Sequence, residues 1–324
     1  MIVLRAKVLG FCMGVRRAVK IASNQLESPP LSTPLQKVYT LGPLIHNPQV
    51  LEDLKRRGVT ILDEACLNPQ SQLSTLNSLS GTVVIIRAHG VSPHTEAELR
   101  RRGAAVVDAT CPKVKASQLK AASLAKQGYR LFLAGEESHA EIAGIRGYAE
   151  DGWLHRDNAD HSGQFLQVVS CAAEAEKSAA RLAAEDAALY THSAHSGLSA
   201  KTALLAQTTI SAEEYQAIGE AVSRHVPELE IVRTICAATR ERQDSLRELL
   251  GKTDAVVIAG GKASANTRRL LAIAQEAGKP CAIAETAGDI PPDFFRLETI
   301  GLAAGASTPD LVIDAIEKAL ISGM

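Results

Sequence analysis

The sequence is poor in aromatic residues, has almost no excess of charge of either sign, and lacks a long uncharged apolar segment. Aromatic side chains make up only 3% of the 324 residues, and the formal net charge is −1. A nearly neutral chain has no broad basic field, so nucleic acid is not an expected partner. No stretch approaches the ~18 apolar residues of a membrane-spanning helix, so we expect no membrane partner.

The chain also lacks closely spaced cysteines and a secretory signal. Arg5 and Lys7 interrupt the first apolar run, and Arg16 and Arg17 follow soon after, which is unlike a signal peptide. Without such a signal, six cysteines in a chain of this length indicate reduced thiols rather than a disulfide framework. We therefore expect a soluble, cytoplasmic protein whose core is built from Ala, Val, Leu and Ile.

Short apolar runs alternate with amphipathic helical segments, and this rhythm predicts an α/β fold with parallel sheets. The expected strands are 2–9, 38–41, 83–87, 105–108, 130–134, 165–169, 203–206, 230–235, 255–259, 281–284 and 299–303. The expected helices are 15–26, 49–57, 95–102, 114–126, 212–224, 241–250, 267–277 and 309–321. Segments 27–36 and 67–80 have the composition of surface loops. The Ala/Glu-rich segment 171–190 is expected to be a helical decoration rather than a core element.

Three isolated cysteines, Cys12, Cys111 and Cys236, each follow a strand-like run and precede a helical segment. In α/β sheets such positions lie at the carboxyl ends of strands, where ligands collect. A helix N-terminus stabilises a thiolate, and three thiolates can hold an iron–sulfur cluster with one iron left open. Ordinary buried cysteines, or zinc held by three cysteines and a histidine, are the alternatives. The other cysteines lack this setting and are expected to be core or surface thiols: Cys66, Cys171 and Cys281.

A second set of residues has the types that hold phosphate groups, namely histidines, small hydroxyls and amides in turns that open helices. This set comprises His46, His89, His139, Ser264, Asn266 and Ser307. Singly each is weak evidence, because such turns are common helix caps. Glu141, close to His139, and Thr208 at a strand end could relay protons. A carboxylate in the first turn of a helix is also favoured by the helix dipole alone.

Together these segments resemble the 4-hydroxy-3-methylbut-2-enyl diphosphate reductases, the IspH/LytB family. The segments that carry the resemblance are GFCMGVRRAV, LIHNPQV, RAHGVSP, DATCPKV, HAEIAGIRGY, QTTIS, TICAATRERQ, GGKASANTRRL and GLAAGASTPD. They follow the family's order and span nearly the whole chain. Nine ordered blocks are far more specific than any single one.

The resemblance implies a trefoil of three pseudo-symmetric α/β domains, with parallel sheets around a central iron–sulfur cluster. The implied domains are 14–111, 112–235, and 236–324 together with 1–13. Cys12, Cys111 and Cys236 would bind a [4Fe-4S] cluster whose fourth iron is open to the substrate. The implied reaction is reductive dehydroxylation of the allylic diphosphate to isopentenyl and dimethylallyl diphosphates. This reaction ends the non-mevalonate (methylerythritol phosphate) isoprenoid pathway, and a ferredoxin- or flavodoxin-like donor would supply the electrons.

The resemblance also distributes the site residues. The implied diphosphate ligands are His46, His89, Ser264, Ala265, Asn266 and Ser307. His139, Glu141 and Thr208 would surround the allylic hydroxyl, with Glu141 in the proton relay. The family usually has a second serine where this chain has Ala265. The lost hydroxyl predicts an altered affinity of roughly 1 kcal/mol rather than a lost function. The segment between His139 and Thr208 is longer than in the members compared.

Two other functions remain open. A quinolinate-synthase-like enzyme would also use a three-domain trefoil with three cluster cysteines. The His46-Asn47 pair and the Ser264-to-Asn266 turn favour a diphosphate over a dicarboxylate substrate. A non-catalytic iron–sulfur sensor or electron carrier normally closes all four iron positions with protein ligands. Only three cysteines in this sequence are placed to do so.

Overall fold

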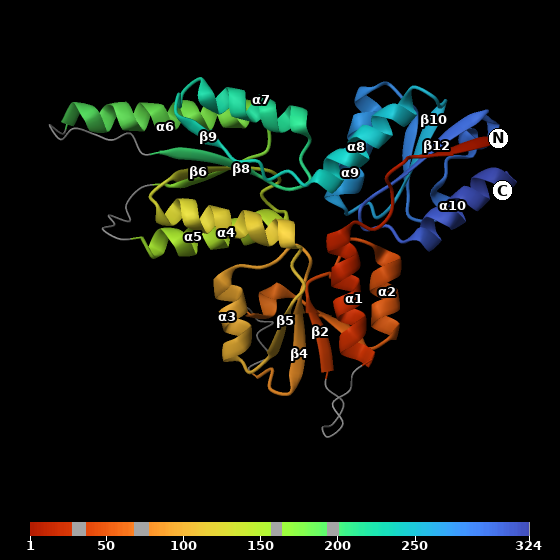
Figure 1. Cartoon of the computed structure of the whole chain (residues 1–324), viewed down its shortest axis with the longest axis horizontal. Helices are drawn as coiled ribbons and strands as arrows, with labels where there is room; N and C mark the ends of the chain where they lie inside the picture. The colour runs from red at the N-terminus through yellow and green to blue at the C-terminus, as the bar shows by residue number, and fades with distance from the viewer. Residues whose placement is uncertain (28–36, 68–77, 157–163, 193–200, 324) are drawn as a thin grey trace. The chain divides into compact units, whose positions relative to one another are not determined.

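A computed structural model describes residues 1–27, 37–67, 78–156, 164–192 and 201–323, apart from the side chains of 189–192. This part of the chain contains three four-stranded parallel sheets (Figure 1), so the predicted α/β class is confirmed. The chain forms two compact units. The first comprises 1–88, 99–111 and 236–324, and the second comprises 89–98 and 112–235. The three-domain boundaries and the trefoil arrangement stay predictions.

Sheet A belongs to the first unit. Its strands, in spatial order, are β1 (Ile2–Arg5), β12 (Thr299–Ala304), β10 (Ala255–Ala259) and β11 (Cys281–Ala284). Its helices are α8 (Ala237–Leu250), α9 (Ala265–Glu276) and α10 (Asp310–Ser322), with short 3₁₀ turns η2 (Ala287–Asp289) and η3 (Pro292–Arg296). Val256 and Ile258 pack with α8 and α9, whereas Ala255 and Val257 pack with α10. This alternation along β10 explains why the strand is apolar throughout.

Sheet B also belongs to the first unit. Its strands, in spatial order, are β3 (Val59–Leu62), β2 (Lys37–Leu41), β4 (Thr82–Ile86) and β5 (Ala105–Asp108). The neighbouring helices are α1 (Met13–Glu27), α2 (Pro48–Arg56), α3 (Pro93–Arg101) and the 3₁₀ turn η1 (Glu64–Leu67). Ala18 and Ala22 of α1 and Leu54 of α2 pack on one face of the sheet with Val83 and Ile85. The edge strand β3 was not predicted from the sequence.

Sheet C forms the centre of the second unit. Its strands, in spatial order, are β7 (Leu166–Val169), β6 (Arg130–Ala134), β8 (Thr202–Ala206) and β9 (Leu229–Ile231). Helices α4 (Pro112–Lys126) and α5 (Ala140–Leu154) cover one face, and α6 (Ala172–His192) and α7 (Ala212–Ser223) cover the other (Figure 1). Each face therefore has its own apolar core.

The three sheets share one strand order. The strands can be taken in the order β10, β11, β12, β1 in sheet A, β2 to β5 in sheet B and β6 to β9 in sheet C. In each sheet the first of these strands lies between the second and the third, and the fourth lies at the edge beside the third. In sheet A that fourth strand is β1, which pairs with β12 although nearly the whole chain separates them. Since all pairings are parallel, every sheet directs its carboxyl ends to one edge.

Two strands end earlier than the apolar pattern predicts. Strand β1 stops at Arg5, and the amide of Val8 donates to the hydroxyl of Ser245 instead of a neighbouring strand (3.1 Å). Strand β9 stops at Ile231. The hydroxyl of Thr234 then bonds both the amide and the carbonyl of Ala206, at 2.7 and 2.9 Å. Side chains thus replace the backbone partners that would have continued these strands.

Helix α5 was not predicted, because its three glycines are unfavourable in a helix. The structure shows why they are tolerated. A Cβ atom on Gly144 would lie 2.7 Å from the side chain of Gln118, and one on Gly152 would lie 2.2 Å from the carbonyl oxygen of Ala122. Both partners are in α4. The glycines therefore permit close packing between α4 and α5, which offsets their low helix propensity.

The expectation that 171–190 is only a decoration is wrong for the first half of α6. Ala175, Ala179 and Leu182 are buried in the same apolar core as Phe132 and Ile218. Because alanine presents so little apolar surface, this stripe is not visible as strong amphipathicity in the sequence. Asp186 adds an ion pair with Arg130 of β6 (2.7 Å).

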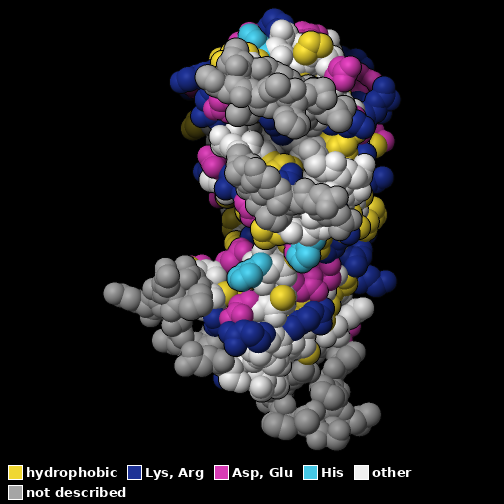
Figure 2. Space-filling view, turned by 90° about the vertical axis from the view of Figure 1, so that its left-hand side faces the viewer, with side chains coloured by type: hydrophobic (Ala, Val, Ile, Leu, Met, Phe, Trp, Pro, Cys, Tyr) yellow, Lys and Arg dark blue, Asp and Glu magenta, His cyan; other side chains and the backbone are white. Residues whose placement is uncertain are grey.

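The remaining expectations about the surface are only partly covered by the structure. Most of the predicted loops 27–36 and 67–80 lies outside the described residues. No helix in the described ranges is long and apolar enough to cross a membrane. Figure 2 shows basic and acidic side chains intermixed over the visible face, in keeping with the small net charge.

The packing of α6 leads to a stability prediction. Ala179→Asp places a carboxylate at a fully buried position, so we expect a loss of about 3–5 kcal/mol, typical of an uncompensated buried charge. Ala184→Asp makes the same change at an exposed position of the same helix, and we expect a loss of at most about 1 kcal/mol. Urea unfolding followed by fluorescence of Trp153, the one tryptophan, reports on this unit. Equal losses in the two variants would show that α6 is peripheral.

Candidate functional site

The predicted site residues all follow the carboxyl end of a strand. The order along the chain is Cys12 after β1, His46 after β2, His89 after β4, Cys111 after β5, His139 and Glu141 after β6, Thr208 after β8, Cys236 after β9, Ser264 to Asn266 after β10, and Ser307 after β12. They form two groups. The second unit contains His89, His139, Glu141 and Thr208, and the first unit contains the others.

The three candidate ligand cysteines have the predicted setting. Cys12 directly precedes α1, Cys111 directly precedes α4, and Cys236 is the N-cap residue of α8. All three are partly buried, belong to the first unit and take part in no disulfide among the described residues. The sulfur of Cys12 accepts a hydrogen bond from the amide of Val15 at 3.5 Å. Its position suits a thiolate, because the first amides of a helix point toward it.

Gly14 allows Cys111 to approach the first turn of α1. A Cβ atom at position 14 would lie 2.5 Å from the sulfur and 3.0 Å from the Cβ of Cys111. Such distances are shorter than any normal contact, so a side chain here would displace the cysteine. The thiol of Cys111 therefore lies against Gly14, which is in the first turn of α1, two residues after Cys12.

Arg242 connects the segments that carry Cys12 and Cys236. Its guanidinium donates to the carbonyl oxygens of Ala238 (2.8 Å) and Gly10 (2.7 Å), each two residues from one of these cysteines. Burial lowers the pKa of Arg242, while the charges of Cys12 and Cys236 act in the opposite direction. Two of the three candidate thiols thus interact with a buried cation, which fits a thiolate-held iron–sulfur group.

The other cysteines differ from these three, although not entirely as predicted. Cys66 lies in η1, and Cys281 begins β11, where burial raises its pKa. Cys171 does directly precede a helix, α6, contrary to the sequence interpretation. It is exposed, however, and a carboxylate, that of Glu174, already lies at the N-terminus of α6. The carboxylate of Glu174 accepts hydrogen bonds from the amide and hydroxyl of Ser170, both at 2.7 Å.

The candidate anion site lies where β2, β10 and β12 end in the first unit. The Ser307 hydroxyl donates to the carbonyl oxygen of His46 at 3.1 Å. A Cβ atom on Gly261 would lie 2.6 Å from that same oxygen, so the backbone must be glycine there. Ser264 caps α9 by accepting from the amide of Thr267 (3.4 Å). These contacts place His46 and Ser307 beside the N-terminus of α9.

Asn266 is the clearest sign of a ligand in this group. Its side chain is only 4% exposed, and within the described residues neither its amide nitrogen nor its amide oxygen has a hydrogen-bond partner. An unpaired buried amide costs free energy unless something satisfies it. Ala265 is the first residue of the same helix and is 7% exposed. Its backbone amide is one of the amides at the helix N-terminus that have no acceptor within the helix. A bound anion could accept hydrogen bonds from the side-chain nitrogen of Asn266 and from the backbone amide of Ala265.

Positive charge near this group comes from residues to which the sequence patterns gave no role. Burial lowers the pKa of His46, and the nearby positive charges of Arg87 and Arg268 lower it further. His46 therefore stays neutral to a lower pH than a free histidine. Arg87 and Arg268 stand within the RAHGVSP and GGKASANTRRL segments, as Arg242 stands within TICAATRERQ. The sequence feature that could have identified these arginines is that each lies in a segment that also contains a predicted site residue. Asn47, by contrast, serves as the cap of α2 and accepts from Val50 (3.0 Å).

The group in the second unit is organised around a buried carboxyl. Glu141 is 1% exposed, and Thr208 donates to it twice, from its amide (2.7 Å) and its hydroxyl (2.9 Å). Burial raises the pKa of Glu141 to about 7, although both hydrogen bonds from Thr208 act to lower it. The carboxyl is therefore poised to take up or release a proton near neutral pH.

The histidines of the second unit flank this carboxyl. His139 is the N-cap residue of α5, and its Nδ1 accepts from the amide of Glu141 at 3.2 Å. In the neutral ring the proton is then on Nε2, so the other side of the imidazole is a donor. The rings of His89 and His139 lie edge to face, with centroids 5.3 Å apart. The structure thus brings together all four predicted residues of this unit.

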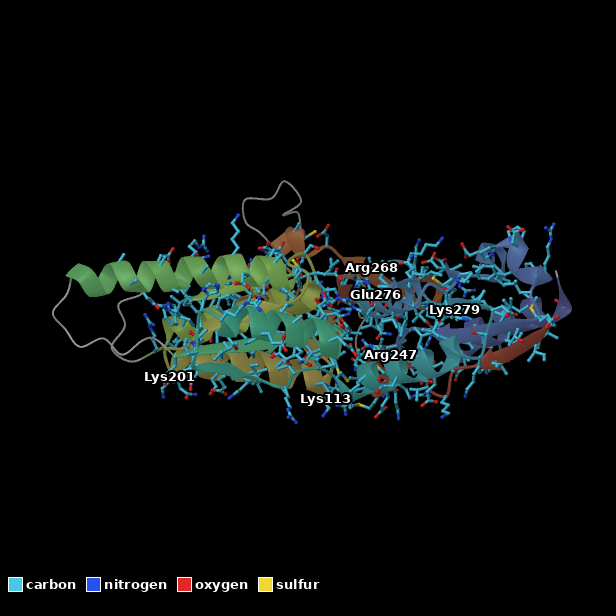
Figure 3. The ribbon with its side chains drawn as sticks, turned by 90° about the horizontal axis from the view of Figure 1, so that it is seen from above. Lys113, Lys201, Arg247, Arg268, Glu276 and Lys279 are labelled. Atoms are coloured by element: carbon cyan, nitrogen blue, oxygen red, sulfur yellow. The ribbon has the colours of Figure 1, made fainter. Side chains whose placement is uncertain are left out.

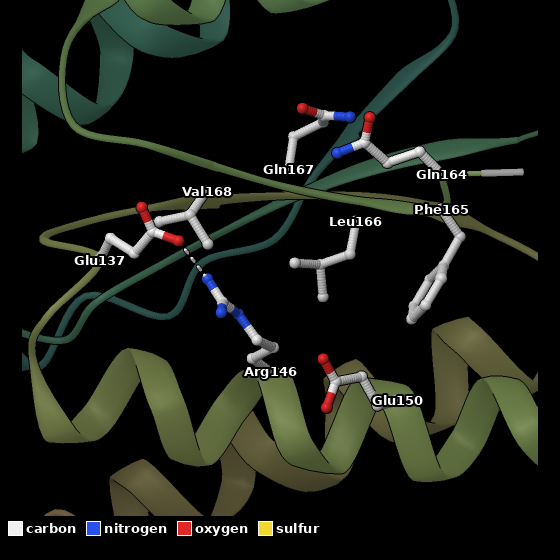
Figure 4. A pocket seen from close by; sticks show the side chains of 8 residues that line it. All are labelled: Glu137, Arg146, Glu150, Gln164, Phe165, Leu166, Gln167 and Val168. Atoms are coloured by element: carbon white, nitrogen blue, oxygen red, sulfur yellow. Dashed lines mark hydrogen bonds and ion pairs between the residues drawn. The ribbon is translucent and has the colours of Figure 1, made fainter.

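A separate pocket of about 530 Å³ contains none of these residues. It lies in the second unit between α5 and β7, and Figure 4 shows Glu137 and Arg146 paired at its rim. Its lining residues are Glu137, Arg146, Glu150, Gln164, Phe165, Leu166, Gln167 and Val168. Because its lining carries charges of both signs and none of the predicted site residues, it is a poor candidate for the catalytic site.

Fold and site together define an α/β protein with three thiols after strand ends of one unit, a helix terminus beside an unpartnered buried amide, and a buried carboxyl of raised pKa. Comparison with known proteins places it further. A model of the LytB protein family matches residues 3–321. A 4-hydroxy-3-methylbut-2-enyl diphosphate reductase of Treponema pallidum is 42% identical and covers 99% of this chain and 84% of its own length. One of Aquifex aeolicus is 36% identical, covering 98% and 94%. The chain therefore belongs to the LytB family.

Two solved structures agree with this assignment. A structure titled as the terminal enzyme of the non-mevalonate pathway is 34% identical, with a TM-score of 0.62, covering 99% of this chain and all of the other. The Plasmodium falciparum reductase has a TM-score of 0.79 at 22% identity, covering 98% and 87%. The latter shows a common fold.

The environment of Glu141 predicts a pH-dependent stability. Its carboxyl ionises near pH 4.5 when unfolded but near pH 7 when folded, so the unfolded state binds fewer protons between these values. Stability should therefore fall as pH rises from about 4.5 to 7, by about 3 kcal/mol in total. Glu141→Gln should remove this loss. Urea unfolding of both proteins across this range checks the difference, and a constant difference would contradict the raised pKa.

Proposed function

We propose that this chain reduces 4-hydroxy-3-methylbut-2-enyl diphosphate to isopentenyl and dimethylallyl diphosphates, the last step of the non-mevalonate pathway. The reaction breaks the allylic C–O bond and forms a C–H bond. It consumes two electrons and two protons and releases water. The observation that carries this proposal is Glu141, a buried carboxyl with a pKa of about 7, in a chain related over its whole length to reductases of this substrate.

Proton supply is the part of the reaction that the chain's own residues perform. Hydroxide is a poor leaving group, so the departing oxygen needs a proton. At neutral pH a carboxyl with a pKa of about 7 is present both as acid and as base. Thr208 keeps this carboxyl oriented through two hydrogen bonds. His139, whose Nδ1 is engaged by the Glu141 amide, would donate from Nε2 to the substrate oxygen.

Substrate binding is assigned mainly to the diphosphate. We assign its oxygens to the N-terminus of α9, with Ala265 and Asn266, and to His46, His89, Ser264 and Ser307. The unpartnered amide of Asn266 and the nearby charges of Arg87 and Arg268 support this assignment. The hydroxyl of Ser307 would turn from the His46 carbonyl toward the ligand. Charge-assisted hydrogen bonds of this kind contribute about 1.5–3 kcal/mol each.

Electrons require a group that the polypeptide does not supply. Cys12, Cys111 and Cys236 would hold a [4Fe-4S] cluster, which supplies one-electron chemistry when bound. We propose a ferredoxin- or flavodoxin-like protein as the donor to this cluster. The cytoplasmic location predicted from the sequence stays a prediction.

An anaerobic assay with reduced viologen and the hydroxy-diphosphate tests both the activity and the role of Glu141. The parent should turn over, and Glu141→Gln should lose 10²–10⁴-fold in kcat, typical of lost general acid catalysis. Iron content and substrate binding should stay close to the parent values. Glu150→Gln makes the same change at an exposed position of α5 and should keep full activity. Turnover of Glu141→Gln within about tenfold of the parent would exclude the role.

The cluster assignment predicts which small changes remove iron. Anaerobically purified protein should be brown and contain about four irons per chain. Cys111→Ser should abolish the cluster. Gly14→Ala should also deplete it, because its methyl group would displace the Cys111 thiol.

Matched controls exist for both changes. Cys281→Ser changes a cysteine at the start of β11. Gly251→Ala adds a methyl group that would have no other atom within 4 Å of it. Both should keep full iron and sulfide content. Full iron in Cys111→Ser, or stoichiometric zinc without sulfide in the parent, would overturn the assignment.

A further inference from the structure

We propose that Arg242 is the counter-charge of the metal centre and sets its reduction potential. The proposal rests on the proposed function, because it assumes that Cys12, Cys111 and Cys236 hold an iron–sulfur cluster. Arg242 is a positioning residue in this scheme. It acts on the electron-accepting group rather than on the substrate.

The guanidinium of Arg242 is fixed in place by backbone contacts. The side chain is 4% exposed, and its two terminal nitrogens donate to Ala238 and Gly10. Since the acceptors are main-chain carbonyls on two separate segments, the charge cannot move without moving one of the cysteine-bearing turns. The Nε–H, by contrast, has no hydrogen-bond partner within the described residues.

No carboxylate of the described chain forms an ion pair with this guanidinium. The neighbouring Glu241 is exposed and acts on it only at a distance. An uncompensated buried charge is costly, so such a residue persists only where an anion balances it. Besides Glu241, the groups whose negative charge acts on Arg242 are Cys12 and Cys236. A cluster held by three thiolates would be the missing anion.

The sign of the effect on reduction follows from Coulomb's law. Adding an electron makes an iron–sulfur centre more negative, so a fixed cation nearby stabilises the reduced form and raises the potential. Low exposure keeps this interaction unscreened by salt. Removing the charge should therefore make the centre harder to reduce. A partly exposed arginine of the same helix that is already paired with a carboxylate, Arg247, should have little influence.

Three variants of the cluster-loaded protein test this. Arg242→Gln removes the charge, Arg242→Lys keeps it, and Arg247→Gln removes a partly exposed charge of α8 that pairs with Asp244 and is labelled in Figure 3. Iron and sulfide content are measured first. The reduction potential is then measured by redox titration followed by electron paramagnetic resonance, without substrate.

We expect the one-electron reduction equilibrium of Arg242→Gln to weaken at least tenfold, which is 59 mV. Arg242→Lys and Arg247→Gln should stay within threefold of the parent. Cluster loss in Arg242→Gln with retention in Arg242→Lys would also support the role of charge. Equal potentials in all variants, or cluster loss from both Arg242 variants, would overturn it and leave a purely structural clamp. Absence of iron from the parent would instead contradict the proposed function.

Discussion

Parallel strand pairing is the constraint on which the rest of this structure depends. Because every strand of a sheet points the same way, the residues that follow the strands gather at one edge. Most of these strands lead through a short turn into a helix. Each such turn therefore presents backbone amides and a short polar side chain. Thiols, histidines and the Glu141 carboxyl all occupy such turns, so one architectural rule repeated in three sheets generates the whole set of reactive groups.

The sequence was most informative where these rules act locally. Apolar runs located eleven of the twelve strands in the described part of the chain, and the residue types at strand ends identified Cys12, Glu141 and Asn266 as candidates. It was least informative where tertiary contacts override local preference. Helix α5 tolerates glycines because α4 packs against them, and α6 buries alanines that carry little apolar signal. Strand ends at Arg5 and Ile231 coincide with hydroxyl hydrogen bonds between segments far apart in the sequence, Val8 with Ser245 and Thr234 with Ala206, which no local pattern reveals.

Within the site, the sequence indicated which groups react but not what controls them. Nothing about a glutamate in the first turn of a helix predicts a pKa of about 7, since that value results from nearly complete burial against two opposing hydrogen bonds. Likewise Arg242 is one of two arginines in the segment from Thr234 to Gln243, and only its burial separates it from the exposed Arg240. Solvent exposure is a property of the assembled fold, so it is where sequence interpretation stops.

The pairing of β1 with β12 has a consequence for how the protein is made. A ribosome produces β1 early and β12 only after nearly all the intervening chain, so the edge of sheet A must wait for its partner. Contacts of such separation in sequence are slow to form. Cys12 follows β1 directly, and its amide bonds to Ala306 just beyond β12 (3.0 Å). An incomplete chain would thus hold Cys12 loosely, because the carbonyl group that fixes its amide is added only near the end of synthesis.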